Sequence, residues 1–235
     1  MNRIYPDSWL LAIDTSSGMA GVAALSGERI VSRNWESDRA QTQTLAPVVD
    51  TVMAELGVGL ADLGALAVST GPGSFTGLRV GMAFAKGLAT FGDLPIVGIP
   101  TLDLIAWPLA QRGGDGIAVI PAGRGRVVWS SFMANGTLGP ATNSTFDDFR
   151  NLCAGQPGTL VAGEMLVEQR TILEADGVHL SLFAQLSRVE VLAHLGRERW
   201  QHGDVDDLAS LVPRYLHGNP NPRQVRDGGL SSPRG

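Results

Sequence analysis

The stretch Gly71-Pro72-Gly73-Ser74-Phe75-Thr76-Gly77 decides how the rest of the chain is read. It follows the apolar run Leu63 to Ser69, which is typical of a buried strand, and it precedes a helical pattern that extends to about Thr90. Its glycines are spaced Gly-x-Gly-x-x-x-Gly, one residue longer than the dinucleotide-binding fingerprint, and the Gly-Lys-Ser/Thr of a Walker A loop does not follow. The stretch therefore predicts a strand, a tight turn and a helix. Whether the turn also receives an anion on its free backbone N–H groups stays open.

Small residues recur along the helix that follows this loop. Gly73, Gly77, Gly81, Ala85 and Ala89 stand four apart and form a ridge without large side chains, so another backbone can approach it closely. Glycine inside a helix costs about 1 kcal/mol relative to alanine, and a packing reason is therefore expected. Two explanations are open. The helix packs between a sheet and its own neighbours, or it meets a counterpart in a partner subunit.

The second explanation involves another amphipathic helix, from Leu45 to Leu56. We expect Thr44 to cap this helix, Pro47 to be tolerated in its first turn, and Gly57 to end it in a left-handed conformation. In this case the residues expected at the partner interface are Leu45, Val49, Val52, Gly73, Gly77, Gly81 and Ala85.

Apolar runs and turn signals on both sides of these helices predict the other elements of the first half. Trp9 to Asp14 and Gly21 to Leu25 are expected to form a β-hairpin, and a third strand follows at Arg29 to Trp35. A strand at Pro95 to Ile99 and a helix from Thr101 complete the order βββαβαβα.

A polar break at Arg112 to Gly116 is the best internal boundary, and it predicts units at residues 1–110 and 111–217. The second unit is expected to be a reduced copy of the first. Its expected strands and helices lie, in chain order, at residues 117–120, 127–133, 146–153, 158–163, 166–176 and 180–195. Residues 218–235 are rich in Gly, Pro, Ser and Arg, so a disordered tail is expected there.

The composition excludes several classes of protein. The 235 residues include 44% hydrophobic and 17% charged residues, which excludes a disordered or fibrous chain. A net charge of −5 does not provide the basic field that grips nucleic acid unaided. The single cysteine, Cys153, cannot form an internal disulfide, and no apolar run is long enough for a signal peptide or a membrane span. A cytoplasmic protein without membrane contact is expected.

A group of polar residues is expected at the tip of the first hairpin. There Asp14, Thr15 and Ser16, together with Gly71 and Gly73, could hold a nucleotide through a metal-bound phosphate, although hairpin tips are commonly just polar. The four histidines lack the spacing of a helical zinc pair. Five acidic residues have no base or nucleophile beside them and are expected on a solvent-exposed face: Glu164, Glu168, Asp204, Asp206 and Asp207. No catalytic residue and no metal site are predicted.

Three segments resemble the TsaB family, also called YeaZ: Leu11 to Ser17, Gly71 to Gly81 and Val97 to Leu102. The resemblance is strong over about residues 9–107, becomes faint in the second half and returns at Val212 to Leu216. It implies the fold of the actin, sugar-kinase and heat-shock ATPase (ASKHA) superfamily. That fold has two actin-like α/β domains of βββαβα type, here with the second reduced, and the order βββαβαβα above begins with these six elements.

The same resemblance implies a role in making threonylcarbamoyladenosine beside the anticodon of tRNA. The family member is the non-catalytic subunit, which binds and activates the threonylcarbamoyltransferase TsaD together with the ATPase TsaE. It requires no cofactor itself, and ATP or ADP and a metal ion are expected through TsaD and TsaE. The resemblance further implies docking on TsaD through two helices of the first domain, a homodimer when TsaD is absent, and tRNA contact only within the complex.

The sequence departs from the family pattern at two places. The Asp-Ala-Arg usual after the first strand of the second domain is replaced by Pro121-Ala122-Gly123-Arg124, and Gln41 replaces a histidine common near the start of the first long helix. An independent kinase-like ATPase is the alternative function, supported by Asp14 and the glycine loop and opposed by the missing acid at Pro121. A peptidase function is not supported, because the sequence offers neither a nucleophile nor a zinc site for it.

Overall fold

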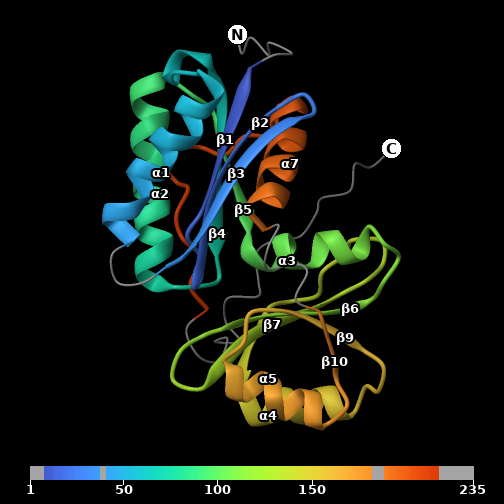
Figure 1. Cartoon of the computed structure of the whole chain (residues 1–235). Helices are drawn as coiled ribbons and strands as arrows, with labels where there is room; N and C mark the ends of the chain where they lie inside the picture. The colour runs from blue at the N-terminus through green and yellow to red at the C-terminus, as the bar shows by residue number, and fades with distance from the viewer. Residues whose placement is uncertain (1–7, 38–40, 182–187, 217–235) are drawn as a thin grey trace, which may run out of the picture.

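Two five-stranded sheets with helices on their faces make up the described part of the chain, residues 8–37, 41–181 and 188–216 of a computed structural model (Figure 1). The strands of the first sheet are β1 (Trp9–Asp14), β2 (Met19–Ser26), β3 (Arg29–Glu36), β4 (Leu63–Gly71) and β5 (Ile96–Pro100), in the order β3-β2-β1-β4-β5. The strands of the second are β6 (Gly116–Pro121), β7 (Arg126–Phe132), β8 (Thr142–Thr145), β9 (Leu160–Gly163) and β10 (His179–Ser181), in the order β10-β9-β6-β7-β8. The expected α/β class is confirmed.

Strand β1 is the centre of the first sheet. It pairs antiparallel with β2 and parallel with β4, and β5 continues the parallel part. Leu11 and Ile13 pack into the core on one face, whereas Leu10 and Ala12 pack into the core on the other. A strand covered on both faces needs an unbroken apolar run rather than an alternating one, which is why this segment reads as it does.

Helices cover both faces of the first sheet (Figure 1). Helices α1 (Gln41–Leu56) and α2 (Phe75–Gly92) lie on one face, and α7 (Arg188–Gln201) lies on the other. A short 3-10 turn, η1 (Leu60–Asp62), leads into β4. Among the described residues, we find no helix with both the length and the apolar character to cross a membrane.

Helix α3 (Thr101–Ala110) lies between the two sheets and belongs to both cores. Its Leu104 packs against the first sheet and α7, whereas Leu102, Ile105 and Leu109 pack against the second sheet. One helix therefore joins the two sheets through apolar contacts on its opposite sides.

Helices α4 (Phe146–Ala154) and α5 (Val167–Ala175) cover the far face of the second sheet. Phe149 and Leu173 from these helices pack with Val119 of β6 in a separate apolar cluster. The second unit thus has the expected strands and these two expected helices, and its sheet is smaller because β8, β9 and β10 are short.

The first helix begins earlier than expected. Helix α1 starts at Gln41, so Thr44 lies inside it and is not its cap, and Pro47 lies beyond the first turn. Apolar periodicity marks only the turns that face the sheet, and a polar first turn leaves no such signal. Gly57 follows the helix with φ +67°, the left-handed conformation expected there.

The expected helix at residues 180–195 is confirmed from Arg188 onward and is wrong at its start. Residues His179–Ser181 form β10, which pairs parallel with β9, and α7 runs from Arg188 to Gln201. Helix α7 also falls inside the expected second unit, 111–217, yet packs on the first sheet through residues such as Leu192 and Trp200. Nothing in the local pattern of a helix states which sheet it will cover. Residues 218–235, the expected tail, lie outside the described residues.

The ridge of small residues on α2 faces the protein's own first hairpin. A Cβ atom placed on Gly81 would overlap Oγ1 of Thr15, and one placed on Gly73 would overlap the carbonyl oxygen of Ser16. Gly77 and Ala85 are buried on the same side of the helix. The first of the two explanations for the ridge therefore holds, because the glycines let α2 approach the tip of the hairpin.

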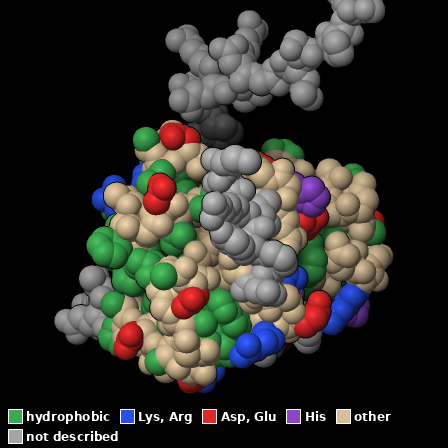
Figure 2. All heavy atoms as spheres, turned by 90° about the horizontal axis from the view of Figure 1, so that it is seen from above, with side chains coloured by type: hydrophobic (Ala, Val, Ile, Leu, Met, Phe, Trp, Pro, Cys, Tyr) green, Lys and Arg blue, Asp and Glu red, His purple; other side chains and the backbone are tan. Residues whose placement is uncertain are grey.

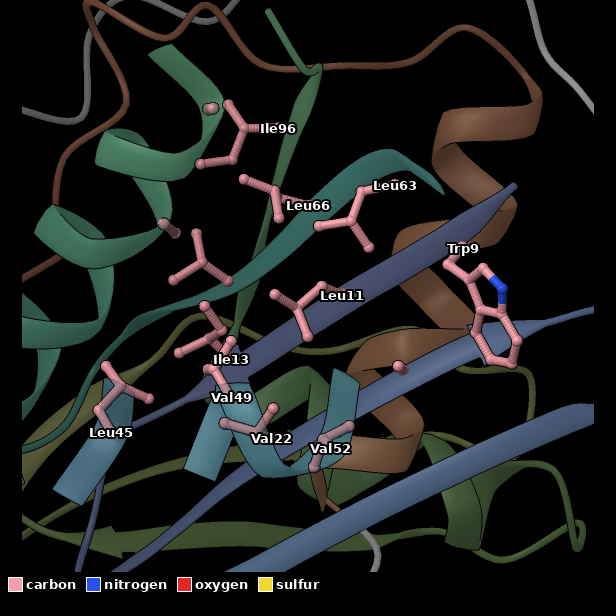
Figure 3. Packing of buried hydrophobic residues seen from close by; sticks show 14 of the residues in the cluster. Trp9, Leu11, Ile13, Val22, Leu45, Val49, Val52, Leu63, Leu66 and Ile96 are labelled. Atoms are coloured by element: carbon pink, nitrogen blue, oxygen red, sulfur yellow. The ribbon is translucent and has the colours of Figure 1, made fainter. Parts of the chain in front are cut away.

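This geometry corrects the expected partner interface. Leu45, Val49 and Val52 point from α1 toward Leu11 and Ile13 in the core of the first sheet (Figure 3). They are at most 5% exposed. Gly77, Gly81 and Ala85 of α2 are buried as well. Of the residues expected at the partner interface, only Gly73, in the loop before α2, is partly accessible in this conformation.

Two glycines of α2 give a matched test of this packing. We expect Gly81→Ala to lower the free energy of unfolding by about 1 to 3 kcal/mol, because the added methyl group overlaps Thr15. Gly87→Ala meets nothing within 4 Å and should raise it by up to about 1 kcal/mol, since alanine is the better helix former. Urea denaturation of both variants measures the difference, and equal effects of the two substitutions would contradict the packing.

Candidate functional site

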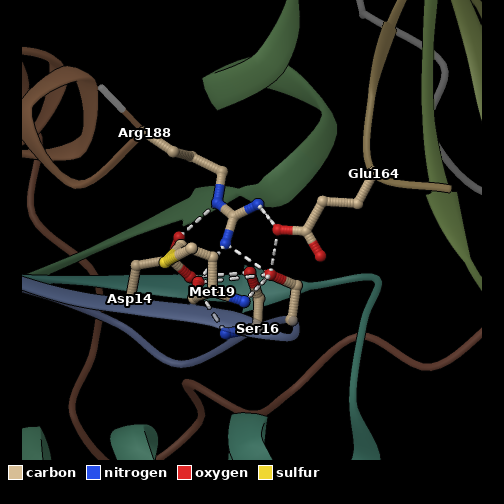
Figure 4. A network of polar contacts seen from close by, with 6 residues as sticks. Asp14, Ser16, Met19, Glu164 and Arg188 are labelled. Carbon is tan, nitrogen blue, oxygen red and sulfur yellow. Dashed lines mark hydrogen bonds and ion pairs between the residues drawn. The ribbon is translucent and has the colours of Figure 1, made fainter. Parts of the chain in front are cut away.

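The tip of the β1–β2 hairpin holds a buried polar network (Figure 4). Asp14, the last residue of β1, is 1% exposed. Its Oδ1 accepts hydrogen bonds from the backbone N–H of Ser16 at 2.9 Å and from the Ser16 hydroxyl at 2.6 Å. Its Oδ2 accepts one from Nε of Arg188. Both carboxylate oxygens of Asp14 are thus engaged within the chain.

Arg188, the first residue of α7, is the centre of this network and is only 2% exposed. Besides its bond to Asp14, it donates from Nη1 to Oε1 of Glu164 at 2.7 Å. Its Nη2 donates to the hydroxyl of Ser17 at 2.5 Å and to the carbonyl of Met19 at 2.6 Å. The guanidinium therefore touches two carboxylates, a hydroxyl and a backbone carbonyl.

Glu164 connects the network to the second sheet. It comes directly after β9, and its side chain is 14% exposed. Its Oε1 accepts a hydrogen bond from the Ser17 hydroxyl at 2.5 Å in addition to the bond from Arg188. Figure 4 shows Arg188 reaching between Asp14 on one side and Glu164 on the other. One side chain of α7 thus links the first hairpin to the second sheet.

The pKa values show which charges the network stabilises. Burial opposes ionisation of Asp14, but the charge of Arg188 and hydrogen bonds from Ser16 and Arg188 outweigh it, so the pKa of Asp14 lies below its ordinary value. Burial opposes the charge of Arg188 as well, yet the two carboxylates hold its pKa above the ordinary value. The ion pair is therefore charged throughout the neutral range.

Four of the five residues expected to bind nucleotide lie together, but their polar groups are already hydrogen-bonded within the chain. Thr15 donates from Oγ1 to the carbonyl of Gly77 at 2.7 Å, and the carbonyl of Ser16 accepts from the backbone N–H of Ser74 at 2.7 Å. Gly73 lies against Ser16, whereas Gly71 lies against the backbone of Arg214 instead. The hairpin tip and the glycine loop thus satisfy each other's hydrogen-bond donors and acceptors.

These residues do not fit a metal-bound phosphate. Such a group needs free carboxylate oxygens for the cation, and Arg188 already supplies the cation for Asp14. Pro121, at the end of β6, offers no second carboxylate. In the part of the chain that the structure describes, we find no group of three His, Cys, Asp or Glu side chains placed to hold a metal ion.

Sequence reasoning missed Arg188 and misread Glu164. The solvated face inferred for the acidic residues does not describe Glu164, which is bonded to Arg188 and Ser17, or Asp206, whose Oδ2 accepts from the backbone N–H of Gly98 at 2.8 Å. The one available signal was a charged residue, Arg188, directly before the apolar positions Val189, Val191 and Leu192 of a helical pattern. That signal does not name a partner, since Asp14 is 174 positions away.

Comparison with known proteins bears on this arrangement. A family model described as TsaD, tRNA N6-adenosine threonylcarbamoyltransferase, matches residues 35–232. The chain is 37% identical over 127 residues to the tRNA threonylcarbamoyladenosine biosynthesis protein TsaB of Escherichia coli, an alignment that covers 53% of this chain and 54% of that protein. The chain therefore spans about half the length of this curated relative.

Two further similarities cover most of the chain. An uncharacterized protein of Mycobacterium tuberculosis is 36% identical over 221 residues, which is 89% of this chain and 92% of that protein. A crystal structure from Pseudomonas aeruginosa, described as similar to peptidase YeaZ, superimposes with a TM-score of 0.70 at 26% identity and covers 89% of this chain and all of that one. The fold described above is therefore that of the YeaZ structure.

Removal of Arg188 tests the buried network. Arg188→Met leaves the buried carboxylate of Asp14 and the half-buried carboxylate of Glu164 without their cation, and we expect a loss of about 3 to 5 kcal/mol in unfolding free energy near neutral pH. The exposed pair of Arg150 and Asp176 supplies the control, and Arg150→Met should change stability little.

The pH dependence of these variants gives an independent check. In the native protein the pKa of Asp14 is lowered, so its contribution is complete above the unfolded value of about 3.8 and is lost as the pH falls through the folded value. Without Arg188, burial raises the pKa of Asp14 and only the hydrogen bonds from Ser16 oppose it, so protonation removes the cost of the unpaired buried charge. The unfolding free energy that Arg188→Met loses relative to the native protein should therefore become smaller between pH 7 and about pH 4.5, as measured by urea denaturation. A deficit that is constant over this range would contradict the assignment.

Proposed function

Because the chain belongs to the TsaB family, also called YeaZ, we propose that it is a non-catalytic subunit in the biosynthesis of threonylcarbamoyladenosine in tRNA. In this proposal it binds and activates TsaD, and TsaE joins the pair. ATP or ADP and a metal ion enter through those two partners and are not required by this chain. The relatives are named for this biosynthesis, which supports a role of the chain in it. The geometry of the hairpin tip supports the non-catalytic part of the proposal.

The closed hairpin is the observation that carries the non-catalytic role. Asp14 would be the residue to bind a nucleotide-bound cation in an independent kinase-like ATPase, and Arg188 occupies it. Freeing Asp14 for such a cation would leave the buried guanidinium of Arg188 without one of its two carboxylates, at a cost of several kcal/mol. The alternative function is therefore opposed by the network as well as by Pro121.

The outward face of α1 and α2 is the surface that we propose for TsaD. On α2 this face is built from small exposed residues, including Ala83 and Gly87, and it ends at Phe91, which is 85% exposed. A Cβ on Gly87 meets nothing, so a partner helix can approach the backbone closely. The same face can pair with a second copy when TsaD is absent. The expected helices are retained, but the contact moves to their exposed side.

Contact with tRNA is proposed only within the complex. The chain carries a net charge of −5. On the face seen from above in Figure 2, Asp and Glu side chains are interspersed with Lys and Arg side chains. Since tight binding of RNA by one protein requires an excess of cations to release counterions, this chain alone should bind tRNA weakly at physiological salt.

A pair of exposed alanines tests the docking face. Ala83→Arg places a long charged side chain on the outward face of α2 and should weaken pairing with the cognate TsaD at least about tenfold, because a desolvated cation costs more than 1.4 kcal/mol. Ala175→Arg makes the same change on the exposed side of α5 and should leave pairing intact. Analytical sizing and titration calorimetry measure both. Normal pairing by Ala83→Arg would remove this face from the proposal.

The division of labour is tested by activity. The purified chain alone should neither hydrolyse ATP nor modify tRNA. Transfer of the threonylcarbamoyl group by TsaD and TsaE should occur only when this chain is added. Asp14→Asn serves as the control for contaminating ATPase, because it removes the carboxylate that an independent kinase-like site would need. Turnover by the chain alone that falls in Asp14→Asn would establish the kinase-like alternative instead.

A further inference from the structure

Two aromatic rings and a guanidinium form an ordered cluster at the first turn of α2. Phe75 is 48% exposed, and its ring centroid lies 5.0 Å from that of Tyr215. The guanidinium carbon of Arg79 lies 3.7 Å from the centroid of the Phe75 ring, and its Nε donates to the Tyr215 hydroxyl at 3.1 Å. We call these three residues the Phe75 cluster. Tyr215 fixes the guanidinium in place, so the cluster is organised before any ligand arrives.

A cavity of about 330 Å³ adjoins this cluster. Phe75 and Tyr215 line it from one side, and Gly123 and Val128 of the second sheet line it from the other. None of the described residues that line it is charged. Cavities of this size hold small ligands, and an uncharged wall with a half-exposed aromatic ring favours a flat, neutral ring.

The surroundings of the cavity carry positive charge although the whole chain is acidic. Arg124 is exposed and follows Gly123 directly in the β6–β7 turn. Arg214 lines a neighbouring cavity of about 380 Å³, which shares Leu216 with the first. Asp103 is the one carboxylate among the described residues lining either cavity.

We propose that the Phe75 cluster and the adjoining cavity bind an unpaired base of RNA, with the neighbouring arginines toward its phosphates. This inference rests on the proposed function, which requires the complex to handle tRNA. An unpaired base supplies the neutral flat ring for Phe75 and Tyr215, and its backbone supplies the anions for Arg124 and Arg214. An acidic peptide would match the arginines but would leave the aromatic faces without a partner. The cluster therefore favours RNA.

The test uses the full chain at low salt, where weak binding is measurable, and a fluorescein-labelled single-stranded RNA of seven nucleotides. Phe75→Ala should weaken binding roughly 5- to 150-fold, the range for loss of one stacked base. Phe75→Tyr keeps a ring and should bind as the native protein does. Arg124→Gln should reduce the slope of log affinity against log salt by about 0.7, the value for one phosphate contact in a single strand.

Matched controls separate stacking from general surface effects. Met133→Ala removes another exposed apolar side chain, 59% exposed, and Arg150→Gln removes another exposed cation, so neither should change RNA binding. Thermal melting establishes that each variant is folded. Equal binding by the native protein and Phe75→Ala overturns the proposal, and so does displacement of the RNA by polyglutamate that is as strong in Phe75→Ala as in the native protein.

Two further measurements distinguish RNA from free nucleotide as the ligand, and separate this inference from the proposed function. Competition by free AMP at concentrations similar to those of the RNA assigns the site to nucleotides rather than RNA and overturns the inference as stated. Pairing with TsaD is measured on the same variants and should be unchanged by Phe75→Ala. If pairing and activation of TsaD fail for the native chain while ring-dependent RNA binding persists, the proposed function falls and the RNA site stands.

Discussion

The guanidinium of Arg188, held between Asp14 and Glu164, is the interaction on which the arrangement of the molecule depends. Its three participants come from the start of α7, the end of β1 and the residue after β9. A buried charge is tolerated only when every partner is in place, because removing one partner leaves another charge buried and unpaired. The first hairpin, α7 and the second sheet must therefore be assembled together.

Apolar packing enforces the same dependence. Helix α3 gives Leu104 to the core of the first sheet and Ile105 to the core of the second, so it cannot leave either without exposing apolar surface. Helix α7 follows the second sheet in the chain, yet it covers the first with Leu192 and Trp200. Neither half of the sequence is complete without the other, even though each contains its own sheet.

These constraints bear on the proposed role. In this chain the polar groups of the hairpin tip and the glycine loop bond to one another: Thr15 to Gly77, and Ser16 to Ser74. The small residues of α2 serve the same internal contact, since Gly81 lets the helix lie against Thr15. A fold built in this way has the hairpin tip and the glycine loop closed on each other, and what it offers to other molecules is its outer surface. A subunit that acts by binding is consistent with such a design.

The sequence by itself determined the element order of the first sheet, because unbroken apolar runs such as Trp9–Asp14 mark strands buried on both faces and glycines mark the turns between them. It also showed that α2 carries a stripe of small residues. Only the tertiary structure decided what that stripe meets, which sheet α7 covers, and that Asp14 is paired with Arg188, 174 positions away. The physical reason is that periodicity reports which residues share a face, whereas the partner of a face or of a charge is set by how distant segments pack together.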